Sequence, residues 1–82
     1  MLDFQSLEQI KYYPLAFRIK KLRLLTELSQ TEFGEKIGIS QTTISMWEKN
    51  KSQPSERSLQ QMVRVFELPS DFFLDIEVQR LE

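Results

Sequence analysis

Residues 30–49 read QTEFGEKIGISQTTISMWEK, and this stretch decides the fold. Ser29 precedes it and Ser40 divides it, and serine is among the residues that best cap the first turn of a helix. The stretch therefore predicts one helix over residues 30–38 and a second over about residues 41–49.

The joint between these two helices is only Gly38-Ile39-Ser40. So short a connection forces the helices to cross steeply, with Gly38 at a positive φ and Ile39 turned into the core. Gly34 belongs to the same geometry, because a glycine inside a helix costs roughly 1 kcal/mol and is best explained by another helix that approaches closely there. The sequence therefore predicts a helix-turn-helix.

Three further helices are predicted by the apolar spacing, and no segment alternates as a strand does. They cover about residues 15–26, a segment capped by Ser55, and a segment capped by Ser70 that reaches the C-terminus. We expect one all-α domain over residues 15–82, preceded by a short N-terminal extension over residues 1–14.

The composition argues against an enzyme. The chain has 82 residues, a formal net charge of -1, no Cys and no His, so thiol and imidazole catalysis are excluded and a metal would have to rest on carboxylates alone. Nothing groups a serine or lysine with a base or with oxyanion donors. We expect no catalytic residue, no metal and no cofactor. No apolar run approaches the ~18 residues that span a bilayer, so we expect a cytoplasmic protein without membrane contact.

Charge is unevenly spread along the chain. Residues 15–51 carry seven basic and four acidic side chains, for a net charge of +3, whereas residues 52–82 carry three basic and six acidic ones. A locally basic face is therefore compatible with the low total charge. Solvated helix surfaces explain the same pattern, so charge alone does not decide the function.

Several short motifs in register resemble the Cro and phage-repressor (XRE) family of helix-turn-helix proteins. The matching elements are Leu22-Arg23, Leu28-Ser29-Gln30, Phe33-Gly34, Ile37-Gly38-Ile39-Ser40, Thr43-Ile44-Ser45, Trp47-Glu48, Lys51, Pro54-Ser55 and Leu59. The resemblance covers about residues 15–75. It implies a five-helix, lambda-repressor-like domain that binds double-stranded DNA, usually as a two-fold dimer, with its third helix in the major groove. A helix-turn-helix used only for packing or protein contact is the alternative.

The outward face of the predicted third helix carries the residues expected to read bases. At 100° per residue, Thr42, Ser45, Met46 and Lys49 point away from the core, and Gln41 lies at the exposed N-terminal flank. Gln41 suits a bidentate contact with adenine, Thr42 and Ser45 suit either hydrogen-bond type, and Met46 suits a thymine methyl group. For Ser45 and Met46, an ordinary solvent-facing position explains the sequence equally well.

Contacts with the DNA backbone are expected around this helix. The resemblance places these residues along one strand: Gln30, Thr43, Lys49, Asn50, Lys51 and Gln53. The free N–H groups of the fourth helix near Ser55 are a further phosphate site. Such contacts position the protein and carry little sequence information.

Two residues are expected to have an architectural role. In the family, the residues at the places of Arg23 and Glu48 form a partly buried ion pair between the first helix and the end of the third. Loss of one partner would cost about 3 kcal/mol. Trp47 is expected in the core with Ile44 rather than as a surface on which bases stack.

The chain departs from the family on the first helix. Phe17 and Leu24 share a face that the family usually fills with charges, which indicates a partner surface. The extension offers an apolar cover made of Leu2, Phe4, Leu7 and Ile10. We expect residues 1–13 to fold back over this face; a mobile tail and a separate protein partner are the alternatives. A further departure is Glu27 where the family usually has Gly, so the end of this helix is expected to be strained or differently shaped.

The last predicted helix has two apolar stripes. One stripe is Phe72, Phe73 and Ile76, and the other is Leu74, Val78 and Leu81. A monomer can bury only one of them. We expect the first to complete the core and the second to meet its copy in a homodimer.

Together these features predict a bacterial or phage-encoded transcriptional regulator, a repressor or controller that occupies a pseudo-palindromic operator. Two other readings stay open. The protein is the antitoxin of a toxin–antitoxin pair, with the extra apolar surface bound to the toxin, or it is a protein-interaction module whose binding is insensitive to salt. RNA binding lacks a glycine-rich clamp or an exposed aromatic platform.

Overall fold

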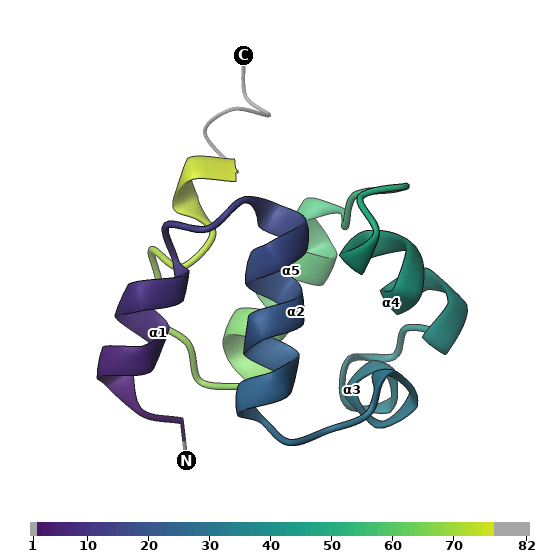
Figure 1. Cartoon of the computed structure of the whole chain (residues 1–82), viewed down its shortest axis with the longest axis horizontal. Coiled ribbons are helices and arrows are strands. Elements are labelled where there is room, and N and C mark those ends of the chain that lie inside the picture. Colours follow the sequence, from purple (N-terminus) through teal and green to yellow (C-terminus); the bar gives the residue numbers. More distant parts are fainter. Residues whose placement is uncertain (1, 77–82) are drawn as a thin grey trace.

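The computed structural model describes residues 2–76, which form helices and no strand. The helices are α1 (Phe4–Ile10), α2 (Leu15–Leu25), α3 (Gln30–Ile37), α4 (Gln41–Glu48) and α5 (Glu56–Val65), and residues 74–76 are also helical (Figure 1). None of the helices in this part of the chain is long and apolar enough to span a membrane. The prediction of an all-α helix-turn-helix fold is confirmed.

Local side-chain chemistry explains where the helices begin. The Ser29 hydroxyl oxygen accepts a hydrogen bond from the Glu32 N–H, and the Glu32 carboxylate accepts one from the Ser29 N–H, so α3 starts in a complete capping box. Ser40 and Ser55 cap α4 and α5 in the same way, each accepting from the backbone N–H three residues on. These predicted helix starts are confirmed.

Four helices end at a residue in the left-handed conformation. Their φ values are 59° for Glu27, 72° for Gly38, 59° for Asn50 and 54° for Glu67. Gly38 and Asn50 take this conformation readily, and both were expected to. The unusual end of α2 at Glu27 is confirmed. The left-handed conformation of Glu67 was not predicted.

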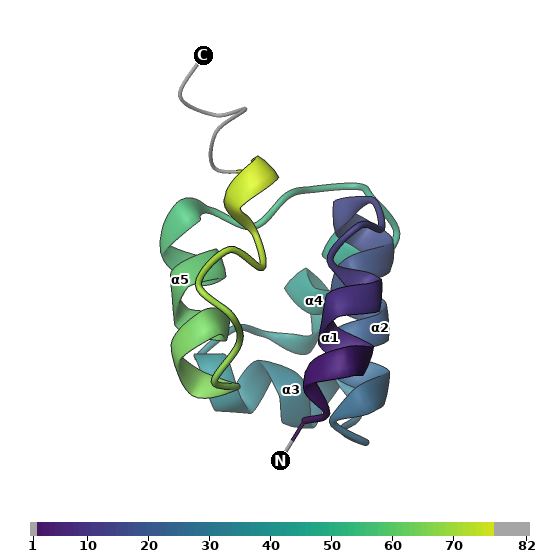
Figure 2. The same cartoon turned by 90° about the vertical axis from the view of Figure 1, so that its left-hand side faces the viewer.

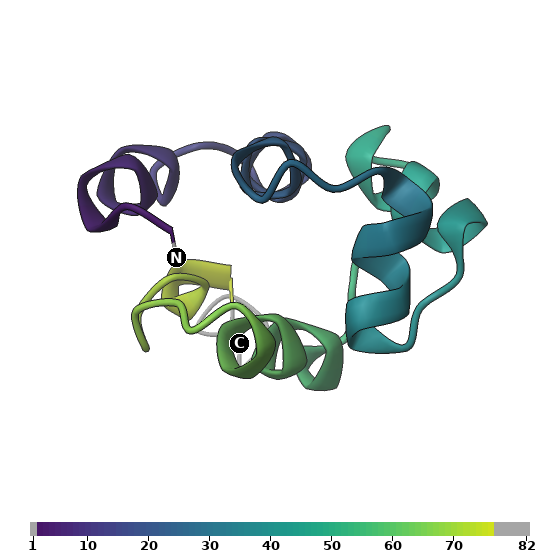
Figure 3. The same cartoon turned by 90° about the horizontal axis from the view of Figure 1, so that it is seen from below.

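The core lies between α2 and α5. In Figure 1, α2 lies in front of α5, and Figure 2 separates the two helices. The views also place α1 and α4 on opposite flanks of α2 (Figure 3). The side chains that α2 and α5 bury completely are Ile19 and Leu22 from α2 and Leu59 and Met62 from α5. Helix α1 therefore covers one flank of α2, and it does not cover α4, which lies on the other flank.

The N-terminal extension packs on the domain, but not where it was expected. Leu7 and Ile10 are buried in the core, whereas Phe17 and Leu24 keep 59% and 50% of their surface exposed. The prediction that residues 1–13 cover these two side chains is therefore wrong. Burial of Leu7 and Ile10 holds α1 against the core instead, and the Lys11 ammonium pairs with Asp71 of the C-terminal segment at 3.1 Å.

The C-terminal segment also differs from its prediction. Residues 70–73 form turns closed by hydrogen bonds of the i to i+3 type, so the helix expected after Ser70 begins only at residue 74. The turns let the adjacent Phe72 and Phe73 both enter the core, where their rings meet edge to face at 4.9 Å. Phe72 and Phe73 thus complete the core as expected, and Ile76 is half-buried against it.

Candidate nucleic-acid interface

The turn between α3 and α4 fixes the angle at which α4 leaves the body. Gly38 adopts a φ of 72°, and the Ile39 N–H returns to the carbonyl of Gly34 at 2.9 Å. A Cβ on Gly34 would collide with the carbonyl oxygen of Ile39 and would lie 3.4 Å from the side chain of Ile44. The close neighbour expected at Gly34 is therefore chiefly the backbone of the turn, with α4 behind it.

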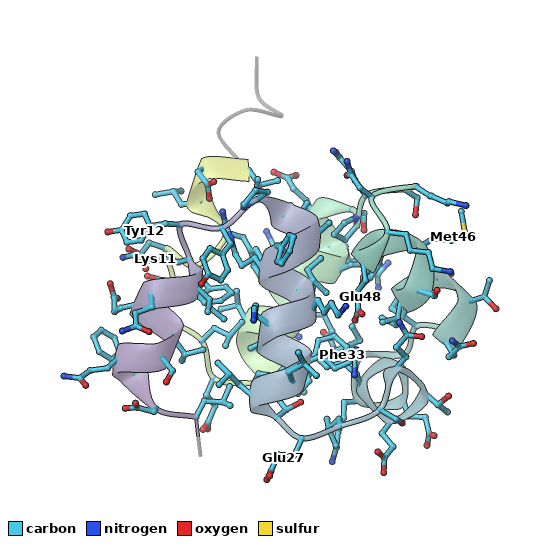
Figure 4. The ribbon with its side chains drawn as sticks, viewed as in Figure 1. Lys11, Tyr12, Glu27, Phe33, Met46 and Glu48 are labelled. Atoms are coloured by element: carbon cyan, nitrogen blue, oxygen red, sulfur yellow. The ribbon has the colours of Figure 1, made fainter. Side chains whose placement is uncertain are left out.

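Helix α4 is anchored by two side chains and leaves a polar face outside. Ile44 and Trp47 are buried, so Trp47 belongs to the core as expected. Gln41 and Thr42 are exposed, and Figure 4 shows Met46 pointing away from the body of the protein. Ser45 is half-buried. The open part of the predicted base-reading set is thus its N-terminal pair and Met46.

The end of α4 is tied to α2 by an ion pair. Nε of Arg23 lies 2.7 Å from Oε2 of Glu48, and Nη2 lies 3.1 Å from Oε1. The third guanidinium nitrogen donates to the carbonyl of Leu28 at 3.0 Å. The side chain of Glu48 is only 4% exposed, and Figure 4 shows this residue between α2 and α4. The bond to Glu48 raises the pKa of Arg23, so the guanidinium stays charged.

Two glutamines extend this ion pair to the surface. Nε2 of Gln30 donates to Oε1 of Glu48 at 3.2 Å, and Nε2 of Gln41 donates to Oε1 of Gln30 at 2.7 Å. An ionised carboxylate can only accept, so Gln30 must turn its NH2 group toward Glu48 and its oxygen toward Gln41. That oxygen in turn requires the NH2 group of Gln41. The buried charge therefore fixes the orientation of the exposed amide.

This orientation leaves Gln41 with what a bidentate contact needs. One N–H of its amide is used by Gln30, while the second N–H and the Oε1 atom remain for a ligand. Adenine offers an acceptor at N7 and a donor at N6 in the major groove, which match this pair. The chain from Arg23 to Gln41 was not foreseen from the sequence, because it depends on the angle between α3 and α4.

The loop after α4 gathers polar groups next to that helix. The Lys51 N–H bonds to the carbonyl of Met46 and the Asn50 N–H to that of Trp47, which closes the helix with Asn50 in the left-handed conformation. The remaining residues of the predicted backbone-contact set divide by exposure. Lys49, Asn50, Lys51, Gln53 and Ser55 are exposed, whereas Gln30 and Thr43 are half-buried. The Thr43 hydroxyl is held by Ser40 at 3.0 Å.

A second arginine was missed as a structural residue. Arg18 is 2% exposed and donates to the carbonyls of Tyr13 and Phe72 and to both carboxylate oxygens of Asp75, all at 2.7–3.0 Å. Hydrogen bonding from Arg18 lowers the pKa of the Asp75 carboxyl. The sequence contained a signal, because Arg18 occupies position i+3 of the buried stripe that begins at Leu15.

A comparison with protein-family models matches residues 19–73 to the helix-turn-helix family. This match covers α2 from residue 19 onward, all of α3, α4 and α5, and the start of the C-terminal segment. No curated protein and no solved structure matches the chain.

Proposed function

The chain belongs to the helix-turn-helix family of the Cro and phage-repressor (XRE) type, whose members are DNA-binding transcription regulators, and we propose that it is a sequence-specific repressor or controller. It acts in the bacterial cytoplasm on a pseudo-palindromic operator. Helix α4 enters the major groove, and Gln41, Thr42, Ser45 and Met46 read base edges.

The observation that carries this proposal is the chain of hydrogen bonds that ends at Gln41. A glutamine held by Gln30 and a buried carboxylate pays little conformational entropy when it binds, since its amide is already oriented. The surrounding α4 surface is uncharged, so it can approach phosphates without repulsion. Phosphate contacts come from the exposed loop residues and from the N-termini of α3 and α5.

Two copies are needed to read a palindrome. Leu74 is 50% exposed beside the buried Phe72 and Phe73, and it begins the apolar stripe assigned to the dimer. Val78 and Leu81, the other members, lie outside the described residues. We propose that this stripe meets its copy across a two-fold axis, which places half-sites about one helical turn apart. Leu74→Asp should shift sedimentation toward the monomer.

The operator test is selection of bound duplexes from a random pool at physiological salt. The expected result is a palindromic consensus, and Gln41→Ala should relax one position in each half-site by a factor of about 5 to 150. The matched control is Gln60→Ala, which removes an exposed glutamine from α5. A consensus that Gln41→Ala leaves unchanged would remove Gln41 from the reading set.

Salt dependence separates the DNA reading from a protein-interaction module. Each neutralised phosphate should contribute about -0.9 to the slope of log K against log salt. Removal of one phosphate contact by Lys51→Ala should reduce the slope by about one while leaving the consensus unchanged. Binding that ignores salt would favour the interaction module.

A second candidate function rests on the exposed apolar residues of α2. Phe17 and Leu24 are left uncovered by α1, and the exposed Lys20 and Lys21 lie between them on the same face. We call these four residues the α2 face. It provides a protein-contact surface outside α4, bordered at Phe17 by the loop that follows that helix, as an antitoxin or a partner-controlled regulator would require. Phe17→Glu/Leu24→Glu should abolish such a contact without changing DNA selectivity.

A further inference from the structure

A groove lies on the flank of the molecule away from α4. It encloses about 600 Å³ between α1, the end of α2 and residues 65–69. Its apolar lining includes Leu2, Phe4 and Leu25, of which Phe4 and Leu25 keep 62% and 39% of their surface exposed. Figure 2 looks onto this side, with α1 and α2 to the right of α5. An open concavity of this size, with a mixed polar and apolar lining, can receive two large side chains.

Both charged residues that line the groove are glutamates. Glu27 ends α2 and Glu67 ends α5, and both are exposed and form no ion pair within residues 2–76. Both hold the left-handed conformation, which glycine would adopt without strain. Figure 4 shows Glu27 at the lower edge of the protein, below α2. The groove is therefore complementary to an occupant that has both apolar side chains and positive charge.

The chain itself presents such a surface. On the α2 face, Phe17 and Leu24 project two large apolar groups, and Lys20 and Lys21 place two ammonium groups between them. The α2 face has two basic residues and the groove has two acidic ones, so their charges are equal in number and opposite in sign. The apolar members match the apolar lining.

We infer that the groove of one copy receives the α2 face of a second copy. The contact is head to tail, because pairing two α2 faces across a two-fold axis would bring Lys20 and Lys21 against their own copies. The groove leaves the α4 of its own copy free, since α4 lies on the opposite flank of α2 from α1 (Figure 1). On the copy that supplies the α2 face, Phe17 lines a hollow with Lys49, Asn50 and Gln53, so the contact lies next to the loop assigned to phosphate contacts. It also differs from the dimer contact assigned to Leu74, so both can form together.

The α2 face has four residues, whereas each partner in a stable protein interface contributes about 20–30, so the contact is weak in free solution. Its effect grows when two molecules are held on neighbouring DNA sites, where the local concentration reaches roughly the millimolar range. The predicted consequence is cooperative filling of adjacent sites. The contact itself does not depend on DNA binding.

Charge reversal and complementation test the contact. The groove variant is Glu27→Lys/Glu67→Lys and the face variant is Lys20→Glu/Lys21→Glu. All proteins in this test carry Leu74→Asp, which removes the other proposed contact. Sedimentation of the full chain at low salt should then show the weight-average mass rising with concentration when both surfaces are unchanged, and each variant alone should associate at least about tenfold more weakly. An equimolar mixture of the two variants should regain association, because each supplies the charge that the other lacks.

Controls separate this contact from general charge effects and from misfolding. Glu35→Lys/Glu56→Lys and Lys36→Glu/Arg57→Glu make the same charge changes at exposed positions outside both surfaces and should behave as Leu74→Asp alone. Circular dichroism should show all variants folded. A mixture that fails to regain association, or a Leu74→Asp protein that associates no more than the two variants, would overturn the proposal. Affinity for a single isolated operator, measured separately, tests the DNA function.

Discussion

Helix α2 carries two arginines that are fastened in different ways. Arg23 faces α4 and pairs with Glu48, whose side chain is 4% exposed, whereas Arg18 faces the C-terminal segment and pairs with Asp75, whose side chain is 54% exposed. The first pair lies inside the family-matched residues 19–73 and the second lies just outside them. The Arg23–Glu48 pair therefore belongs to the helix-turn-helix unit that the family shares, whereas the Arg18–Asp75 pair holds the C-terminal segment of this chain against α2.

The two arginines also differ in what lies beyond their carboxylates. Glu48 orients the amide of Gln30, which in turn orients the amide of the exposed Gln41. Asp75 is the end of its own chain of contacts, and Arg18 satisfies two backbone carbonyls as well. We therefore expect disruption of the first pair to change both stability and DNA selectivity, and disruption of the second to change stability alone.

The largest effect is expected from Glu48→Ala. This change leaves the guanidinium of Arg23 largely buried without its carboxylate and should lower the free energy of unfolding by about 3 kcal/mol. Urea denaturation followed by the fluorescence of Trp47, the single tryptophan, measures the loss. DNA selectivity at the position read by Gln41 should fall as well.

The matched control replaces the pair by Arg23→Leu/Glu48→Leu. Apolar side chains in place of a buried ion pair can restore stability, so this variant should recover most of the free energy of unfolding. It should not recover DNA selectivity, because the acceptor for Gln30 is still absent. Recovery of both properties would show that the ion pair acts on DNA binding only through stability.

A smaller loss, about 2 kcal/mol, is expected from Arg18→Met. The change leaves the carbonyls of Tyr13 and Phe72 without their donor, while Asp75 can be hydrated where it is. Urea denaturation should show the loss and the selected DNA consensus should stay the same. Lys20→Met, on the exposed side of the same helix, should have almost no effect on stability.

The contrast also shows what the sequence can predict. Helix starts at Ser29, Ser40 and Ser55 follow from local chemistry, and so does the left-handed Asn50, because each involves residues a few positions apart. The ion pair of Arg23 required the family resemblance. The set of groups around Arg18 could not be predicted, since its carboxylate partner is 57 residues away and its spacing indicates burial without naming a partner. The missing cover over Phe17 escaped prediction for a related reason, because Leu7 and Ile10 of α1 join a core that includes residues as distant as Phe72 and Phe73.

The ends of α2 and α3 extend the comparison to the backbone. Gly38 fills its left-handed position without strain, whereas Glu27 places a Cβ there. Glu27→Gly should therefore stabilise the fold by up to about 1 kcal/mol, and Gly38→Ala should destabilise it by about 1 kcal/mol. Thermal unfolding of the two variants gives shifts of opposite sign. A destabilised Glu27→Gly would mean that its side chain stabilises the fold more than its conformation costs.

The smallest effect concerns pH and the exposed carboxyl of Asp75. The hydrogen bond from Arg18 lowers the folded-state pKa of this group below its ordinary value of about 3.9, so its contribution is complete above that value and disappears as the pH falls through the folded-state pKa. Because the side chain is 54% exposed, the contribution should stay below about 1 kcal/mol.

The measurement is the difference in unfolding free energy between the wild type and Asp75→Asn. This difference should be constant from pH 7 to about pH 5 and should shrink toward zero as the pH falls through the folded-state pKa, because the wild-type carboxyl then becomes neutral like the amide. Glu35→Gln, at an exposed position on α3 without an ion pair in residues 2–76, is the control. A difference that grows on acidification would mean that the charge of Asp75 destabilises the fold, and the flank would then be held by the two carbonyl contacts of Arg18 alone.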